Sequence, residues 1–298
     1  MTVAAVRIDA DLVRELVATQ FPEWADLPVA AVEPGGWDNR TFRLGDLMSV
    51  RLPSGPGYAS QVAKEQRWLP RLAPQLPLPV PEVVARGLPG RGYPFEWSVY
   101  RWLEGEPASS AAVEDASELA TTLAGFLHAL QRIDATGGPL AGAHSAWRGG
   151  PLETYDIETR RSISALGATI PGARAIAVWE AALEARWHGS SVWFHGDVAA
   201  GNLLIRDGRL EAVIDFGCSG VGDPSCDTTI AWTLLSGESR TAFREALGAD
   251  RATWARGRGW ALWKALNKLV QHLETNPAEA AAARRVIDAV LAEHERDT

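Results

Sequence analysis

The sequence predicts an α+β protein with a β-rich N-terminal part and a mainly helical C-terminal part. Short β-type runs broken by glycines lie between Val29 and Pro53, and an aromatic and aliphatic run spans Phe95 to Leu103. After that run the sequence is alanine-rich, and its apolar residues recur at helical spacing. A chain of 298 residues is long enough for two lobes. The change of character places a break near residue 100.

In the N-terminal part, apolar spacing and turn residues predict alternating helices and strands. Gly45-Asp46 is typical of a hairpin turn between two of the strands. The prolines between Pro74 and Pro81 exclude a continuous helix or a central strand and predict a rigid connector. The expected elements are a helix at 12–21, strands at 30–33, 41–44 and 48–52, a helix at 61–72, and a buried strand at 95–103.

The C-terminal part is expected to be helical around one short β-rich region. Leu119, Leu123, Phe126, Leu127 and Leu130 form one helical stripe. A second stripe follows near residues 176–187. The other expected elements are strands at 191–194, 203–205 and 210–215, and helices at 227–235, 239–247, 252–273 and 279–293.

Composition narrows the function classes. With 46% hydrophobic and 22% charged residues the chain has an ordinary globular balance, and a net charge of -8 argues against a nucleic-acid binder. Cys218 and Cys226 match no common zinc spacing, so both are expected to be reduced thiols. There is no signal-peptide pattern and no apolar run long enough to span a membrane. We expect a cytoplasmic protein that has no nucleic-acid or membrane partner and no evident obligate protein partner.

The strongest chemical signal is the segment from His195 to Asn202, H-G-D-V-A-A-G-N, followed by I-D-F-G with Asp215. Phosphoryl transfer needs a carboxylate that orients and deprotonates the acceptor hydroxyl, and oxygen ligands for the metal on the phosphates. Asp197 and Asn202 share one loop, and a hairpin between Leu203 and Ile214 would return Asp215 to that loop. Asp, Asn and Gly are also common in turns for conformational reasons, but this combination and spacing favour a catalytic interpretation.

The segment FHGDVAAGNLL…VIDFGCSGVGDPSCD resembles the aminoglycoside phosphotransferase family, a relative of the protein kinases. The resemblance implies a protein-kinase-like bilobal fold in which Asp197 is the catalytic base. It also implies that Asn202 and Asp215 are magnesium ligands and that His195 is a scaffold of the loop. Gly222-Asp223-Pro224 and Asp227 match the next family element. We interpret these residues as structural: they hold the loop, and Asp227 caps a helix.

In the N-terminal part the resemblance is looser. Gly35 and Gly36 stand where the family has its nucleotide-covering loop, and glycine allows backbone N–H groups to approach phosphates. Arg51 stands where the family presents a phosphate-binding lysine, and Glu65 would be the helix carboxylate that pairs with it. Arginine keeps the charge but differs from lysine in geometry. Lys64 is the only nearby lysine and is expected to point away from the helix face that carries Glu65.

The run Val99 to Gly105 resembles the family's inter-lobe hinge. By that resemblance the carbonyl of Arg101 and the N–H of Leu103 meet the base of the nucleotide, with Tyr100 at the rear of the pocket. ATP is the default nucleotide and GTP the alternative, with magnesium. The expected domains are a nucleotide-binding lobe at 1–104, including the hinge at 98–104, and a helical lobe at 105–298 that carries the catalytic loop and the acceptor site.

The acceptor is less clearly encoded. The 13 tryptophans include several in the C-terminal part that would stack on sugars or line an apolar pocket, although most are expected to be core. The resemblance favours an aminoglycoside-like hydroxyl acceptor. A macrolide, another metabolite of the choline or homoserine type, and a catalytically silent nucleotide-binding module are the alternatives.

Overall fold

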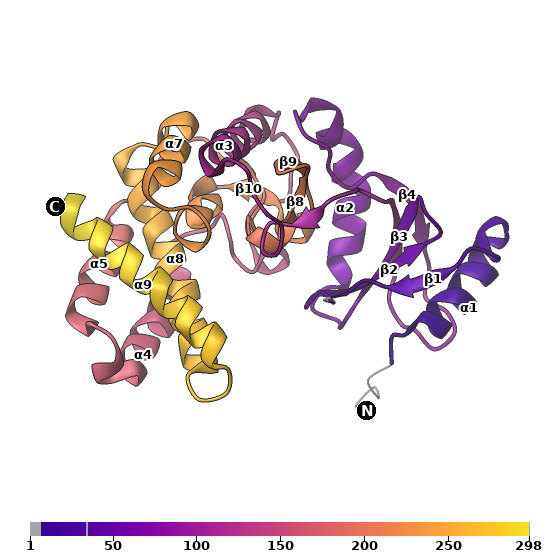
Figure 1. Cartoon of the computed structure of the whole chain (residues 1–298), viewed down its shortest axis with the longest axis horizontal. Coiled ribbons are helices and arrows are strands. Elements are labelled where there is room, and N and C mark those ends of the chain that lie inside the picture. The colour runs from indigo at the N-terminus through magenta and orange to yellow at the C-terminus, as the bar shows by residue number, and fades with distance from the viewer. Residues whose placement is uncertain (1–6, 34, 298) are drawn as a thin grey trace. The chain divides into compact units, whose positions relative to one another are not determined.

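The computed structural model describes residues 7–33 and 35–297. The chain divides into two compact units (Figure 1). The first comprises Met1–Glu104 and Ala212–Gly217, and the second comprises Gly105–Glu211 and Cys218–Thr298. An antiparallel sheet forms the centre of the first unit and helices dominate the second, so the predicted fold class is confirmed.

The first unit is built on a five-stranded antiparallel sheet in the order β1-β2-β3-β5-β4. Leu44 pairs with Met48 across the β2–β3 hairpin, and the turn starts at Gly45 with φ of +58°, as its sequence predicts. Two helices accompany the sheet, α1 and α2. The strands are β1 (Val29–Ala31), β2 (Asn39–Leu44), β3 (Met48–Pro53), β4 (Val83–Gly87) and β5 (Trp97–Arg101), and the helices are α1 (Ala10–Gln20) and α2 (Ala59–Leu72).

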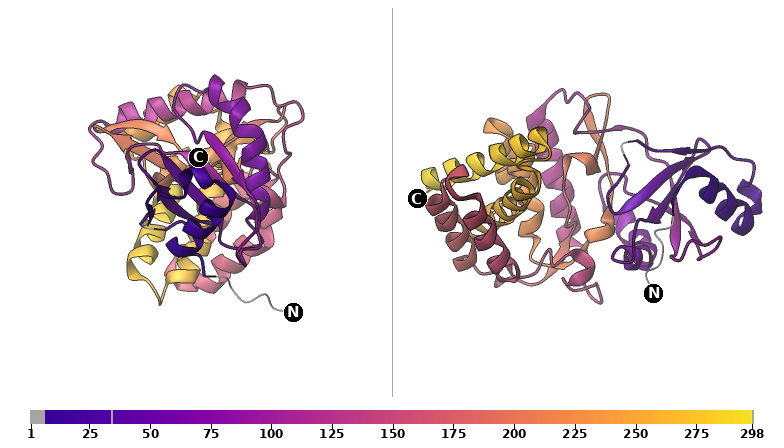
Figure 2. Two further views of the ribbon diagram at one scale, coloured as in Figure 1. Left: turned by 90° about the vertical axis from the view of Figure 1, so that its right-hand side faces the viewer. Right: turned by 90° about the horizontal axis from the view of Figure 1, so that it is seen from below.

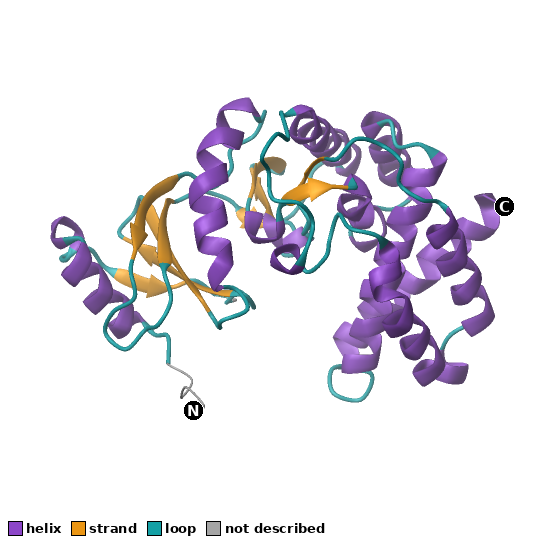
Figure 3. Ribbon diagram, turned by 180° about the vertical axis from the view of Figure 1, so that it is seen from behind, coloured by secondary structure: helices purple, strands orange, loops and turns teal. Residues whose placement is uncertain are grey.

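Side-chain alternation gives this sheet two different faces. On one face Val50 and Leu52 of β3 join a core with Val13 and Leu16 of α1. Arg51 lies between them in the sequence, so it points to the opposite face, where α2 packs against β4 and β5. Figure 3 shows the sheet between these two helices. The pleat of β3 therefore directs Arg51 toward α2.

The second unit contains seven α-helices and several short strands in its described residues. The long helix α8 is central, because α4, α5 and α9 all pack against it (Figure 2). The helices are α3 (Ala116–Arg132), α4 (Asp156–Leu166), α5 (Gly172–Glu184), α6 (Ile230–Thr233), α7 (Gly237–Leu247), α8 (Arg251–His272) and α9 (Pro277–Asp297). The strands are β6 (Glu106–Pro107), β7 (Val192–Phe194), β8 (Leu203–Arg206), β9 (Arg209–Val213), whose last two residues belong to the first unit, and β10 (Gly220–Gly222).

The second unit differs from the sequence prediction in two places. Helix α4 was not predicted from the sequence. The single helix expected at 227–235 is a 3₁₀ helix, Pro224–Thr229, followed by the short α6. Asp227 therefore caps no helix: Asp223 is the N-cap, and its carboxylate accepts from the N–H of Ser225 at 3.0 Å. Among the described residues, no helix is both long and apolar enough to cross a membrane.

Candidate active site

A buried carboxylate, that of Asp227, holds the loop from His195 to Asn202 in place. Asp227 accepts hydrogen bonds from the backbone N–H groups of His195 at 2.8 Å and Gly196 at 2.7 Å. Gly196 has φ of +85°, and a Cβ there would lie 2.4 Å from the carbonyl oxygen of Cys218. Only glycine fits this position. The predicted role of Asp227 in holding the loop is confirmed, and it positions the residue that follows, Asp197.

Asp197 and Asn202 lie together on this loop, as predicted. The Asn202 amide nitrogen donates to the backbone carbonyl of Asp197 at 2.9 Å and to its Oδ2 at 3.3 Å. The amide oxygen of Asn202 accepts no hydrogen bond from another described residue, so it is left for a ligand. An amide oxygen is one of the hard oxygen ligands that magnesium accepts.

Two cations approach the other carboxylate oxygen of Asp197. Lys264 Nζ of α8 lies 3.0 Å from Oδ1, and Arg148 Nη2 lies 3.7 Å from the same atom. Burial by itself would raise the pKa of Asp197, but Lys264 and Arg148 outweigh it and hold the pKa well below its usual range. The carboxylate is therefore ionised and able to accept a hydrogen bond from a hydroxyl group. Neither cation was predicted from the sequence.

In the first unit, Arg51 lies between two carboxylates. Its Nη1 is 3.6 Å from Glu65 Oε1 of α2, and its Nη2 is 3.1 Å from Asp215 Oδ2. The hydroxyl of Tyr100 donates to the other oxygen of Glu65 at 2.5 Å. Burial by itself would lower the pKa of Arg51, but Asp215 and Glu65 raise it above its usual value. The structure thus brings the predicted residues Arg51, Glu65 and Asp215 together around one permanent positive charge.

The expectation for Lys64 is wrong. This lysine is buried, and its Nζ donates to the carbonyl oxygen of Gly217 at 2.6 Å. Gly217 is two residues after Asp215, so Lys64 holds the segment that carries the predicted metal ligand. Asp215 itself has φ of +67°, an uncommon conformation for a residue with a side chain. This segment is therefore held in place by side chains from α2 and β3.

The predicted glycines and hinge residues occupy loops and strand ends. A Cβ on Gly36 would lie 2.9 Å from the carbonyl oxygen of Asn39, whereas Gly35 faces open space. Arg101 is the last residue of β5, and its backbone N–H donates to the carbonyl oxygen of Glu82 at 2.9 Å. Leu103, two residues later, donates no backbone hydrogen bond to the described residues. The roles of Gly35, Gly36, Arg101 and Leu103 in nucleotide binding stay predictions.

The donor set suits magnesium. Asp215 supplies a carboxylate and Asn202 an amide oxygen, and magnesium typically takes one or two such protein ligands, with phosphate oxygens and water completing its shell. Among the described residues no group of three or more His, Cys, Asp or Glu side chains could hold a metal ion without such help. Joint binding of one ion by Asn202 and Asp215 stays a prediction.

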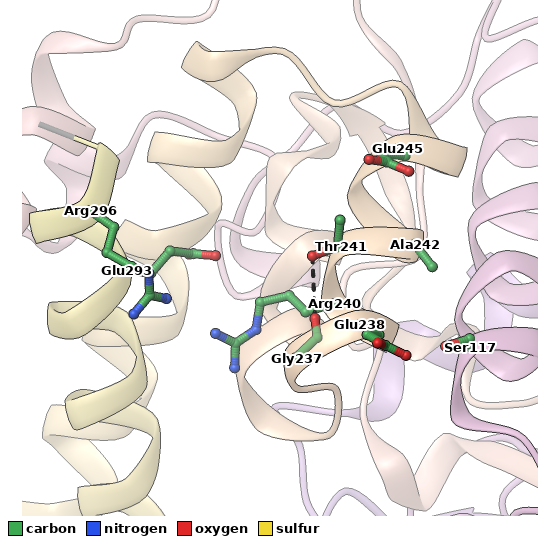
Figure 4. A pocket seen from close by; sticks show the side chains of 9 residues that line it. All are labelled: Ser117, Gly237, Glu238, Arg240, Thr241, Ala242, Glu245, Glu293 and Arg296. Carbon is green, nitrogen blue, oxygen red and sulfur yellow. Dashed lines mark hydrogen bonds between the residues drawn. The ribbon is translucent and has the colours of Figure 1, made fainter.

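A separate surface pocket of about 590 Å³ lies in the second unit beside α7 and α9 (Figure 4). Arg240, Glu293 and Arg296 are among its charged lining residues. Arg240 Nε donates to the carbonyl of Ala231 at 2.6 Å, and Glu293 accepts from the indole nitrogens of Trp232 and Trp254. None of the predicted site residues lines this pocket. Arg240 and Glu293 are therefore engaged in contacts between helices.

The fold and the loop chemistry define an enzyme of the protein-kinase-like phosphotransferase class. The chain belongs to the phosphotransferase enzyme family, whose sequence model matches residues 31–260. It is therefore a phosphotransferase. No curated protein matches the sequence significantly.

Solved structures share this fold at low sequence identity. The GDP and kanamycin complex of APH(2")-IIia has a TM-score of 0.74 and 16% identity, and the match covers 95% of this chain and 99% of that one. The apoenzyme of macrolide 2'-phosphotransferase MphH from Brachybacterium faecium has a TM-score of 0.60 and 24% identity, with 94% and 97% covered. A macrolide 2'-phosphotransferase type I has a TM-score of 0.62 and 20% identity, with 94% and 97% covered.

Proposed function

We propose that this protein transfers the γ-phosphoryl group of ATP, or alternatively GTP, to a hydroxyl group of a small molecule. The first unit with the hinge at 98–104 would bind the nucleotide, and the second unit would bind the acceptor. The observation that carries the proposal is the geometry of Asp197: an ionised carboxylate beside the Asn202 amide, on a loop anchored by Asp227. Such a carboxylate orients an acceptor hydroxyl and takes its proton.

The other predicted residues receive roles that follow from their contacts. Arg51 would bind the nucleotide phosphates while Glu65 keeps it in place. Asn202 and Asp215 would hold magnesium, which supplies neutralisation of the phosphate charge. The backbone groups of Arg101 and Leu103 would recognise the base, and Gly35 and Gly36 would let the backbone approach the phosphates.

For the acceptor we propose an aminoglycoside-like antibiotic. A net charge of -8 favours the approach of a polycationic molecule. The similarity in fold to a protein solved with GDP and kanamycin supports both the nucleotide and this acceptor class.

A macrolide is the second candidate, and a specific observation favours it. In the second unit, the residues Leu140, Trp147 and Ile157 are 70%, 46% and 68% exposed. An acceptor with a large apolar surface would cover apolar residues of this kind and gain from their burial. The similarity to macrolide 2'-phosphotransferases points the same way.

The test is a coupled assay of nucleoside diphosphate release with ATP or GTP and magnesium. Kanamycin, gentamicin, streptomycin, a macrolide, choline and homoserine serve as acceptors, and Asp197→Asn is the inactive control. Phosphorylation of one acceptor, verified by mass spectrometry, supports the proposal and names the class. Nucleotide binding without transfer to any acceptor, and without hydrolysis, would instead support a catalytically silent module.

A further inference from the structure

The two cations beside the carboxylate of Asp197 bring more positive charge than this one carboxylate neutralises. Lys264 and Arg148 both approach its Oδ1, at 3.0 Å and 3.7 Å. In the described part of the chain, Asp197 is the only carboxylate that forms an ion pair with either cation. One negative and two positive charges leave a local surplus of one positive charge. Such a surplus in a partly buried site attracts an anionic ligand.

The two cations differ in how firmly they are held. Arg148 has a side chain only 18% exposed, and its Nη1 contacts the sulfur of Cys218 at 3.1 Å. The Lys264 side chain is 41% exposed, and within the described residues the Asp197 carboxylate is its one hydrogen-bond partner. A lysine ammonium on a flexible four-carbon chain is able to change partners. Arg148 is thus the permanent counter-ion of Asp197, and Lys264 is the cation that is free to move.

Lys264 is not needed to hold α8 in the fold. The neighbouring residues Leu262, Ala265 and Leu266 are buried and carry the packing of this part of the helix. One turn further on, Lys268 forms an ion pair with Glu279 and has a side chain 44% exposed. The two lysines lie on the same helix and have similarly exposed side chains. Only Lys264 directs its charge at the catalytic loop.

The loop itself provides no lysine or arginine. Between His195 and Asn202 the one acidic residue is Asp197. The four residues that separate Asp197 from Asn202 are uncharged: Val198, Ala199, Ala200 and Gly201. A phosphoryl group in transfer carries negative charge on three equatorial oxygens, and its stabilisation by a cation is a major catalytic contribution. A cation for this purpose must therefore come from another element.

We propose that Lys264 is a catalytic residue that binds the transferring phosphoryl group, an inference that rests on the proposed function of Asp197. In this step the acceptor oxygen forms a bond to the γ-phosphorus and its proton passes to Asp197. The bond from that phosphorus to the bridging oxygen breaks, and its electron pair stays on the nucleoside diphosphate. Lys264 changes partner from Asp197 to a phosphoryl oxygen as this happens, so that Asp197 is released to take the proton.

The first experiment needs no acceptor. The dissociation constant of Mg·ADP is measured by calorimetry with and without aluminium fluoride, which mimics the phosphoryl group in transfer. We expect the fluoride to tighten binding in the native enzyme, and Lys264→Met to reduce this gain about 10-fold or more while leaving the affinity for Mg·ADP alone unchanged. Lys268→Met is the matched control and should keep the full gain. An unchanged gain in Lys264→Met overturns the proposal.

The second experiment uses turnover, either with an acceptor found in the panel or as hydrolysis of ATP to water. Lys264→Met should lower kcat about 100-fold with little change in the KM for nucleotide, and Lys264→Arg should restore much of the loss. A double-mutant cycle with Asp197→Asn then separates direct from indirect action. If Lys264 only positions Asp197, its substitution has no further effect in the Asp197→Asn background, and the direct role is wrong.

Failure of this inference is distinguishable from failure of the proposed function. If Asp197→Asn retains turnover, the base assignment fails, while the aluminium fluoride measurement still reports on Lys264. If Asp197→Asn is inactive and Lys264→Met equals Lys268→Met in both measurements, the proposed function stands and the Lys264 role falls. Thermal melting of each variant verifies that the fold is retained, with Lys264→Gln as a second substitution.

Discussion

Arg51 Nη2 lies 3.1 Å from Asp215 Oδ2, so the guanidinium forms an ion pair with the carboxylate that we propose as a magnesium ligand. Asp215 has a side chain 29% exposed, whereas that of Arg51 is 14% exposed. When a nucleotide binds together with magnesium, Arg51 would move from Asp215 to the phosphates, and the metal ion would replace it beside the Asp215 carboxylate. Such an exchange would link nucleotide binding to metal binding, because each partner would compensate the charge that the other leaves.

The first prediction concerns Arg51. Arg51→Met should weaken Mg·ADP binding about 10-fold or more and lower the melting temperature, because Glu65 and Asp215 lose their shared cation. Arg51→Lys should retain part of the affinity. Calorimetry and thermal melting measure both effects. Arg86→Met on β4, which removes an exposed ion pair with Glu96, is the control. Equal affinities in Arg51→Met and native enzyme would show that Arg51 binds no phosphate.

The second prediction concerns Asp215. Asp215→Ala should abolish the gain in nucleotide affinity that magnesium provides, since the proposed bridging carboxylate is lost. Nucleotide is titrated with magnesium and with a chelator in both proteins. A magnesium effect of native size in the variant would exclude Asp215 as a ligand.

The third prediction concerns Asp197. Asp197→Asn keeps the shape of the side chain but removes its charge and its ability to accept a proton. Turnover should fall about 10²–10⁴-fold while nucleotide affinity stays within a few-fold. Steady-state kinetics and calorimetry check the two parts. Turnover within a few-fold of native would remove Asp197 from the mechanism.

The fourth prediction concerns Asp227, which holds the loop through two backbone N–H groups. Asp227→Asn offers one oxygen in place of two and a donor in place of an acceptor. We expect a loss of about 2–3 kcal/mol in the free energy of unfolding, together with reduced kcat. Urea denaturation measures the first effect. Asp207→Asn is the control, because Asp207 is exposed, and its φ of +50° suits asparagine. If both variants unfold at the native midpoint, Asp227 is dispensable.

Much of the fold and of the candidate site could be predicted because the relevant residues are close in sequence. Asp197 and Asn202 share one loop, and the β2–β3 hairpin depends on a glycine at its turn. The alternation of side chains along β3 also directs Arg51 away from the core that contains Val50 and Leu52. Local spacing and local conformational preference determine features of this kind.

Other features were decided only by the tertiary structure. Lys264 and Asp197 are 67 residues apart in the chain and meet because α8 packs against the 3₁₀ helix Pro224–Thr229, whose Asp227 holds the loop. The one available signal was a lysine among the tryptophans and alanines of a largely buried helix, and periodicity assigns no partner to such a residue. Lys64 likewise bonds to Gly217, 153 residues away. A polar side chain on a packed helix takes its partner from whichever segment tertiary packing places beside it, and no local pattern encodes that choice.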